Sequence, residues 1–155
     1  MTYINTCEGW LYLAVVLDPF SRRIVGWAMG ATIDSELACR ALKMAWHSRL
    51  PVGGLIFHSD RGSQYASHHY TELLAEHGIK ASMSRKGNCW DNACSETLFG
   101  SLKVERLHGM TFHSHREAKD ATLDWLFCRA GTLLRQIFFQ RHGPVDTKLP
   151  RVLVD

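Results

Sequence analysis

The sequence lacks the features that mark membrane-bound, secreted or disulfide-stabilised proteins. No apolar run reaches the roughly 18 residues of a membrane-spanning helix, and the first residues lack the basic start and apolar core of a secretory signal. The five cysteines are odd in number and form no Cys-x-x-Cys pair, which argues against a disulfide framework or a zinc knuckle. Repeats and Pro/Ser-rich linkers are also missing. These absences favour one domain in a reducing cytoplasm.

What is present is an ordinary globular composition. The 155 residues are 46% hydrophobic and 21% charged, which excludes a disordered or fibrous chain. Lys and Arg total 18 against 15 Asp and Glu, a formal charge of +3. This balance permits a polyanionic partner such as DNA but does not demand one.

The order of apolar segments predicts a mixed α/β sheet covered by helices. Residues 10–17 form a near-continuous apolar run, typical of a strand buried on both faces, and Asp18-Pro19 ends it. Thr32 or Asp34 can cap the first helix. The expected order is β-β-β-α-β-α-β-α, with strands near 2–4, 10–17, 24–29, 55–59 and 79–83, and helices near 37–45, 66–77 and 91–107. Residues 111–126 also have helical spacing, and no period is evident from Phe127 onward.

Asp60 is the first candidate for chemistry. It directly follows a short apolar strand and precedes Gly62, which suits a tight turn. In open α/β sheets, ligand sites gather beyond the carboxyl ends of strands, so a carboxylate here is well placed. The alternative is an Asp that only forms the turn or caps the next helix.

Glu96 is the second candidate, on the helix expected over 91–107. At 100° per residue, Asn92, Glu96 and Lys103 share one face, away from the core side with Leu98 and Leu102. Two carboxylates at one sheet edge suit Mg²⁺, and Lys103 would point at a phosphate nearby. Alternatively, these are ordinary charges on a solvated helix face.

Three segments together resemble the catalytic core of bacterial insertion-sequence transposases, which is of the retroviral-integrase type. The group is the one usually called IS-three, and the matching product is that of its second reading frame. The resemblance covers residues 2–126, and the order and spacing of its motifs make it specific. The segments are WLYLAVVLDPFSRRIVGW (residues 10–27), HSDRGSQY (58–65) and NCWDNACSE (88–96), the last followed by LKVE at 102–105.

The resemblance implies a ribonuclease-H-like fold for residues 1–126, with an antiparallel meander followed by parallel strands, and a divergent tail over 127–155. It implies a triad of two Asp and one Glu that binds two Mg²⁺ (or Mn²⁺) ions and carries out DNA strand cleavage and strand transfer. By position, Asp60 matches the second acid and Glu96 the third. The residues expected to contact DNA, unless they are merely solvated, are Arg61, Arg85, Lys86, Asn92 and Lys103.

Both ends depart from the family pattern. The first acid belongs to an Asp-x-Thr-Tyr motif and would lie one residue upstream of Met1, while Asp18 matches a separate hairpin position where it is expected to form a turn. Beyond Trp125 the family's Tyr-Asn-x-x-Arg-x-His segment is missing. We therefore expect a core truncated at both ends, with strand transfer absent or weak because a lost ligand disturbs metal geometry.

Several alternatives stay open at this point. The chain is alternatively a catalytically inactive remnant that binds DNA, full-length transposase or a second copy of itself. A ribonuclease-H-type nuclease acting on RNA–DNA hybrids and a decayed reading frame that barely folds are further readings. A serine hydrolase is disfavoured because no Gly-x-Ser-x-Gly elbow is present.

Overall fold

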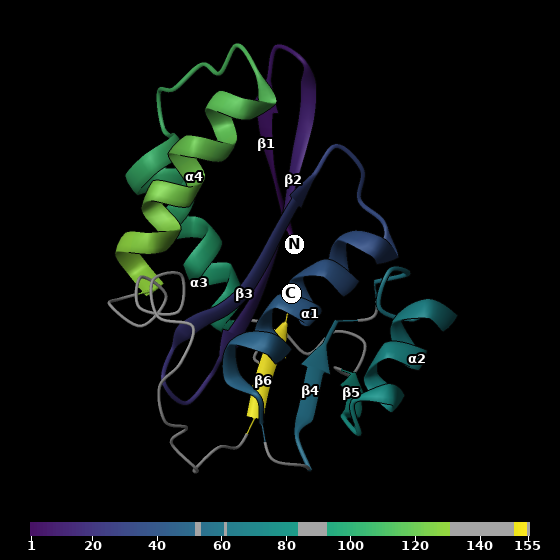
Figure 1. Cartoon of the computed structure of the whole chain (residues 1–155). Helices are drawn as coiled ribbons and strands as arrows, with labels where there is room; N and C mark the ends of the chain where they lie inside the picture. The colour runs from purple at the N-terminus through teal and green to yellow at the C-terminus, as the bar shows by residue number, and fades with distance from the viewer. Residues whose placement is uncertain (52–53, 61, 84–92, 131–150, 155) are drawn as a thin grey trace.

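The computed structural model describes residues 1–51, 54–60, 62–83, 93–130 and 151–154 (Figure 1). The chain begins with an antiparallel meander of β1 (Thr2–Thr6), β2 (Gly9–Asp18) and β3 (Arg23–Gly30). Every residue of β2 from Leu13 to Asp18 is buried. Both faces of this strand are covered, which explains its near-continuous apolar run.

Helices and strands then alternate, as the sequence predicted. The Asp34 side chain caps the first helix by accepting a hydrogen bond from the Leu37 amide at 2.8 Å. Ser67 caps the second helix in the same way through the Tyr70 amide, at 3.2 Å. The elements are α1 (Ser35–Arg49), β4 (Ile56–Ser59), α2 (His68–Glu76) and β5 (Lys80–Met83), and β4 pairs with β5 in parallel.

The helix expected over 91–107 has two parts. An α-helix, α3 (Ala93–Leu102), continues into a single π-helical segment, η2 (Lys103–Leu107), and the chain then forms α4 (His115–Ala130). A π-turn holds more residues than an α-turn, so side chains beyond Leu102 do not keep the 100° spacing on which the sequence analysis relied. The first residues of the expected helix, 91 and 92, lie outside the described residues.

The strands form one mixed sheet with helices on both faces, which confirms the predicted fold class (Figure 1). Its order is β3, β2, then both β1 and β6 (Arg151–Val154), then β4 and β5. Alternate side chains of β2 point to opposite faces of the sheet. Ala14 and Val16 pack with α1 and α2, whereas Val15 and Leu17 pack with α3 and α4.

The C-terminal region contributes more regular structure than its sequence indicated. Helix α4 continues past residue 126 to Ala130, and residues 151–154 form β6 inside the central sheet. Sequence periodicity did not reveal β6, because four residues are too few for a reliable pattern. Among the described residues, no helix is both long and apolar enough to cross a membrane.

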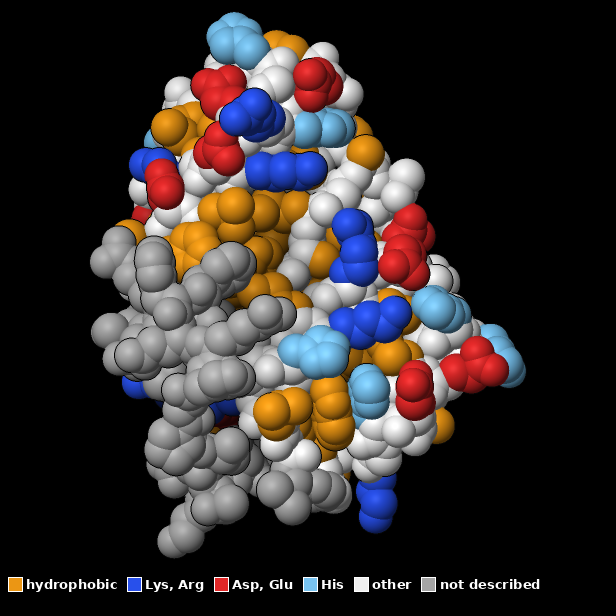
Figure 2. Space-filling model, viewed as in Figure 1, with side chains coloured by type: hydrophobic (Ala, Val, Ile, Leu, Met, Phe, Trp, Pro, Cys, Tyr) orange, Lys and Arg blue, Asp and Glu red, His pale blue; other side chains and the backbone are white. Residues whose placement is uncertain are grey.

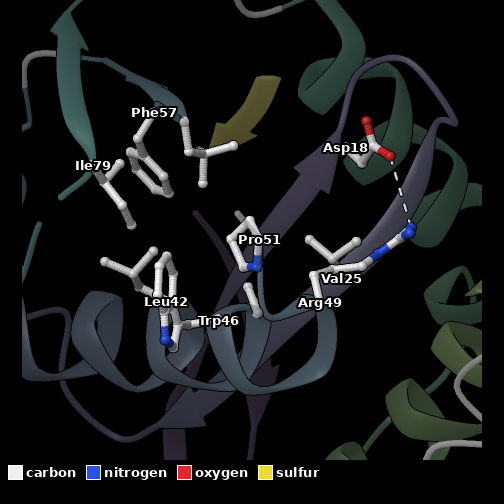
Figure 3. Close-up of a pocket in the computed structure, with 10 residues that line it drawn as sticks. Asp18, Val25, Leu42, Trp46, Arg49, Pro51, Phe57 and Ile79 are labelled. Atoms are coloured by element: carbon white, nitrogen blue, oxygen red, sulfur yellow. Dashed lines mark ion pairs between the residues drawn. The ribbon is translucent and has the colours of Figure 1, made fainter. Parts of the chain in front are cut away.

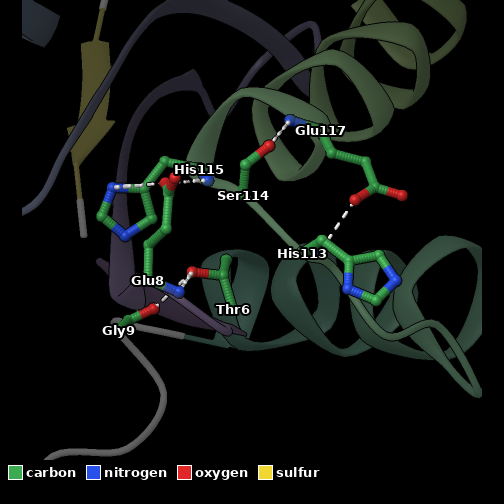
Figure 4. A network of polar contacts seen from close by, with 7 residues as sticks. All are labelled: Thr6, Glu8, Gly9, His113, Ser114, His115 and Glu117. Carbon is green, nitrogen blue, oxygen red and sulfur yellow. Dashed lines mark hydrogen bonds and ion pairs between the residues drawn. The ribbon is translucent and has the colours of Figure 1, made fainter.

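Polar contacts attach the start of α4 to the β1–β2 hairpin (Figure 4). Ser114 accepts a hydrogen bond from the Glu117 amide at 3.2 Å, and the Glu117 carboxylate accepts one from the His113 amide at 2.8 Å. Glu8 in the hairpin turn accepts a hydrogen bond from the His115 amide at 2.7 Å. These bonds satisfy amides that the first helical turn leaves unpaired, and they hold α4 over its face of the sheet.

Candidate functional site

Asp60 lies directly after the carboxyl end of β4, where the sequence analysis expected it. Its Oδ1 accepts a hydrogen bond from the Gly62 amide at 2.6 Å, so the side chain also forms the turn that was the alternative reading. The residue is half-buried. The bond to Gly62 orients the carboxylate at the strand end, and solvent still reaches it. Asp60 can therefore stabilise the turn and bind a ligand at the same time.

The neighbouring strand supports this sheet edge. His58 lies two residues before Asp60, and its Nδ1 is 3.1 Å from the Ser82 hydroxyl on β5. Ser59, between them, is buried and points to the opposite face of the sheet. Asp60 therefore extends from a strand whose neighbours already hold its backbone and side chains in place.

Glu96 lies in the first turn of α3 and is exposed. The helix is anchored by Phe99 and Leu102, which are buried against β2 in the cluster that contains Val15. The positive end of the helix dipole favours a carboxylate in the first turn. Glu96 is thus an accessible oxygen donor on a helix fixed to the sheet.

Lys103 is exposed and lies where α3 passes into the π-helical segment, and its position on the same face as Glu96 stays a prediction. It begins the π-helical segment, and its Nζ lies 5.0 Å from the ring centroid of Tyr3 in β1. The Tyr3 ring in turn meets the Trp10 ring edge-on, with centroids 4.9 Å apart. Lys103 therefore belongs to a cation–aromatic group at β1, within which a phosphate could still reach the ammonium.

The residues described here include oxygen donors of the type that hard divalent cations prefer. Asp60 and Glu96 fit a magnesium or manganese site by chemistry, because both carboxylates are accessible and neither is held in an ion pair in the described residues. The described part of the chain contains no group of three or more His, Cys, Asp or Glu side chains that could hold a metal ion. The convergence of Asp60 with Glu96 stays a prediction. The other expected DNA contacts lie outside the described residues: Arg61, Arg85, Lys86 and Asn92.

Asp18 has the structural role that its sequence context predicted. It is only 2% exposed, and its carboxylate accepts hydrogen bonds from the Phe20 amide at 3.0 Å and the Ser21 hydroxyl at 2.5 Å. Arg49 lies 3.7 Å from the same carboxylate, at the rim of an apolar cavity of about 30 Å³ between α1 and the sheet (Figure 3). With its oxygens committed to the turn and to Arg49, Asp18 is a poor metal ligand.

The face shown in Figure 2 has no continuous basic band among the described side chains. Lys and Arg are interspersed with Asp and Glu, and apolar side chains gather near the middle of this face. Attraction of a polyanion to this face would thus depend on individual basic groups.

Comparison with known proteins identifies the family. The family model described as "Integrase core domain" matches residues 1–89, more than half of the chain. The chain belongs to the integrase core domain family. The matched part of this integrase core spans β1 to β5 and includes Asp60, whereas Glu96 lies beyond it.

Relatives of this integrase core come from bacterial insertion sequences. The chain is 46% identical over 128 residues to "Transposase InsF for insertion sequence IS3A" of Escherichia coli (strain K12), which covers 83% of this chain and 44% of that protein. It is 49% identical over 142 residues to the "Insertion element IS600 uncharacterized 31 kDa protein" of Shigella sonnei, covering 92% of this chain and 49% of the relative. The chain thus spans about half the length of the curated relatives it matches.

A solved structure shares the fold. A chain of the simian T-cell lymphotropic virus intasome, solved in complex with the PP2A regulatory subunit B56 gamma, superposes with a TM-score of 0.65. The match covers 96% of this chain and 55% of that chain at 16% identity. This likeness establishes the integrase-like architecture, and the expected resemblance to insertion-sequence transposases of the IS-three group is confirmed by the relatives.

Proposed function

We propose that the chain is the catalytic core of a DNA transposase that cleaves and joins DNA strands with the help of Mg²⁺ or Mn²⁺. The observation that carries this proposal is Asp60, held by Gly62 at the carboxyl end of β4 in an integrase-type sheet. Its partners would be the ends of a mobile element, target DNA and a second transposase subunit. Such a protein would act in the cytoplasm of a bacterium.

In this proposal Asp60 and Glu96 are the metal ligands. The bound ions would activate the attacking oxygen and stabilise the leaving oxygen during strand cleavage and transfer. The contribution of the chain is to hold the two carboxylates in place, Asp60 through its turn and Glu96 through the buried anchors of α3. Lys103 would bind a DNA phosphate, aided by the residues that flank the two acids in the sequence: Arg61, Arg85, Lys86 and Asn92.

Residues 1–126 contain only two of the three acids that the family resemblance implies. We propose that two carboxylates alone hold the metal loosely, so a polypeptide confined to these residues transfers strands weakly or not at all. The activity of the 155-residue chain then depends on whether a third carboxylate reaches the site.

A cleavage and joining assay on labelled element-end DNA with Mg²⁺ tests the proposal. Glu96→Gln and Asp60→Asn each remove a ligand charge while keeping side-chain shape, and we expect turnover to fall by about 100-fold or more. Asp120→Asn is the matched control, because Asp120 is an exposed acid on α4. Full activity in both ligand variants would refute the assignment.

The alternative is a remnant that binds DNA, or full-length transposase, without cutting. The exposed pair of Tyr3 and Trp10, 54% and 48% accessible, with Lys103 beside it, favours a nucleic-acid contact that needs no metal. Salt-dependent DNA retention that Tyr3→Ala weakens and EDTA leaves unchanged, together with no detectable cleavage by the unmodified chain, would support this second function over the first.

A further inference from the structure

The turn between β2 and β3 carries an aromatic side chain that the rest of the fold leaves uncovered. Phe20 is 84% exposed, more than any other large hydrophobic side chain that the structure describes. The three residues that follow it, Ser21, Arg22 and Arg23, are exposed as well. One exposed apolar side chain is common on protein surfaces, so its meaning depends on what holds it there and what surrounds it.

The turn is held in place from its buried side. The Asp18 carboxylate is enclosed by the fold and accepts hydrogen bonds from the Phe20 amide and the Ser21 hydroxyl. Figure 3 shows Arg49 extending from the end of α1 to the same carboxylate, at 3.7 Å. A carboxylate is costly to bury unless it is paired and hydrogen-bonded, and these contacts provide both. The backbone that carries the Phe20 ring is therefore anchored to β2 and to α1.

The backbone at Arg22 adopts the left-handed conformation, with φ of 55°. Residues with a side chain rarely adopt this conformation, and glycine or asparagine adopts it at lower cost. The Arg22 side chain forms no ion pair or hydrogen bond within the described part of the chain that would offset this cost. A strained backbone without a compensating contact points to a role in binding.

The charge of the turn indicates the chemistry of its partner. Arg22 and Arg23 are exposed, and residues 19–31 contain no acid. The adjacent acid, Asp18, is buried in its contacts with the turn and with Arg49. Exposed guanidinium groups bind phosphates, and exposed aromatic rings stack on nucleic-acid bases. A polyanion that carries planar rings matches both kinds of group at once, which favours a nucleic acid over an apolar protein surface.

This turn lies at the end of the sheet opposite to Asp60. β2 is antiparallel to β6 and β6 is parallel to β4, with Leu17 beside Leu153 and Leu153 beside His58. The chain therefore leaves β2 at the end of the sheet where β4 begins, whereas Asp60 follows the end of β4. In Figure 1 the turn is at the lower left, and the β4 arrow points away from that end. A ligand on the turn is thus separate from the candidate metal site.

We propose that the β2–β3 turn is a binding site for single-stranded nucleic acid, in which the Phe20 ring stacks on an unpaired base and Arg22 and Arg23 bind the adjoining phosphates. Bases in a duplex are already stacked on one another, so an unpaired base is the one that the ring can reach without unstacking a duplex. The site goes beyond the proposed function, because it requires no metal and neither of the two candidate metal ligands.

Fluorescence anisotropy with a labelled oligothymidine strand, in EDTA at low salt, tests the stacking. We expect Phe20→Ala to weaken binding of this strand by about 5-fold or more, and to weaken binding of a labelled duplex less. Ile33→Ala is the matched control, because Ile33 is an exposed apolar side chain, 52% accessible, in the connection from β3 to α1. Failure of the unmodified chain to bind the strand, or equal affinity in Phe20→Ala, would overturn the proposal.

Arg22→Asn separates binding from folding. Because asparagine tolerates the left-handed backbone better than arginine, we expect the melting temperature to stay equal or rise. The loss of one phosphate contact should at the same time weaken strand binding and lower the slope of log K against log salt by about 0.7. Arg116→Asn on α4, also at an exposed arginine, is the control and should leave the slope unchanged.

Two results would contradict this role of the turn. One is a salt slope and affinity in Arg22→Asn equal to those of the unmodified chain. The other is a change in self-association of Phe20→Ala, followed by sedimentation velocity, with no change in strand binding, which would make the turn a protein contact instead. These measurements involve neither metal nor cleavage, so their failure leaves the proposed function standing, and failure of the cleavage assay leaves the turn to be judged by binding alone.

Discussion

Gly26 is the position where the contact between α1 and the sheet is most sensitive to added volume. A Cβ at Gly26 would collide with the carbonyl oxygen of Ala41 and would lie 2.7 Å from the Ala45 backbone nitrogen and 2.8 Å from its Cβ. These atoms belong to the backbone of α1 or are fixed to it, so a side-chain rotation cannot relieve the overlap. Gly26→Ala must instead move the helix from β3.

The expected size of this effect follows from that collision. Overpacking a core costs about 1–3 kcal/mol, and backbone neighbours put Gly26→Ala near the upper end, at about 3 kcal/mol. The gain of about 0.5–1 kcal/mol from replacing a glycine inside a strand is smaller than this cost. The net loss is then about 2–2.5 kcal/mol, and for a domain of this size the melting temperature should fall by roughly 4–10 °C.

Thermal unfolding followed by circular dichroism measures the shift. Gly100→Ala is the matched control, because a Cβ there meets nothing within 4 Å and Gly100 lies inside α3, where alanine favours the helix by about 0.5–1 kcal/mol. We therefore expect opposite signs from the two substitutions. A melting temperature in Gly26→Ala that equals or exceeds the parent value would refute the close approach of α1 to β3.

Three further outcomes follow from buried or capped groups. Burial raises the pKa of the Cys39 thiol to about 11, so at pH 8 iodoacetamide should alkylate it at least about 10-fold more slowly than the exposed Cys94, and denaturant should remove the difference. Asp34→Ala should cost about 1 kcal/mol in urea unfolding, because it removes the cap on the Leu37 amide. The hydrogen bond from the Thr32 hydroxyl, followed by that from the Leu37 amide, lowers the pKa of Asp34 below 3.8. The stability that the Asp34 carboxylate contributes is therefore complete above about pH 4 and is lost as the pH falls through the lowered pKa, and Asp34→Ala should lose this part of the acid dependence of unfolding. Leu102→Ala should cost about 2–5 kcal/mol in the same unfolding assay, because the Leu102 side chain at the end of α3 is fully buried.

Local sequence determined the order of the elements and the position of Asp60. The apolar run of β2, the capping side chain of Asp34 and the acid directly after β4 are each readable from neighbouring residues. Burial on both faces, helix capping and strand ends act over a few residues, so their signals survive in the linear chain. From β1 to α3, the order predicted from these signals is the order observed.

Helix geometry beyond Leu102 could not be predicted in the same way. The helical wheel assumed a constant period over residues 91–107, and the π-helical segment Lys103–Leu107 departs from that period. The contact of Lys103 with the Tyr3 ring joins residues one hundred positions apart, so no window of sequence contains it.

The sequence by itself determined which residues form strands and helices in the first 126 positions, and which acid follows a buried strand. Only the tertiary structure decided that residues 151–154 enter the sheet between β2 and β4, beside the start of β1. An isolated segment of four residues has no stable strand conformation, because a strand obtains its hydrogen bonds from neighbours supplied by the rest of the fold. The position of residues 151–154 beside β4 is accordingly a property of sheet register, which the linear order of amino acids does not contain.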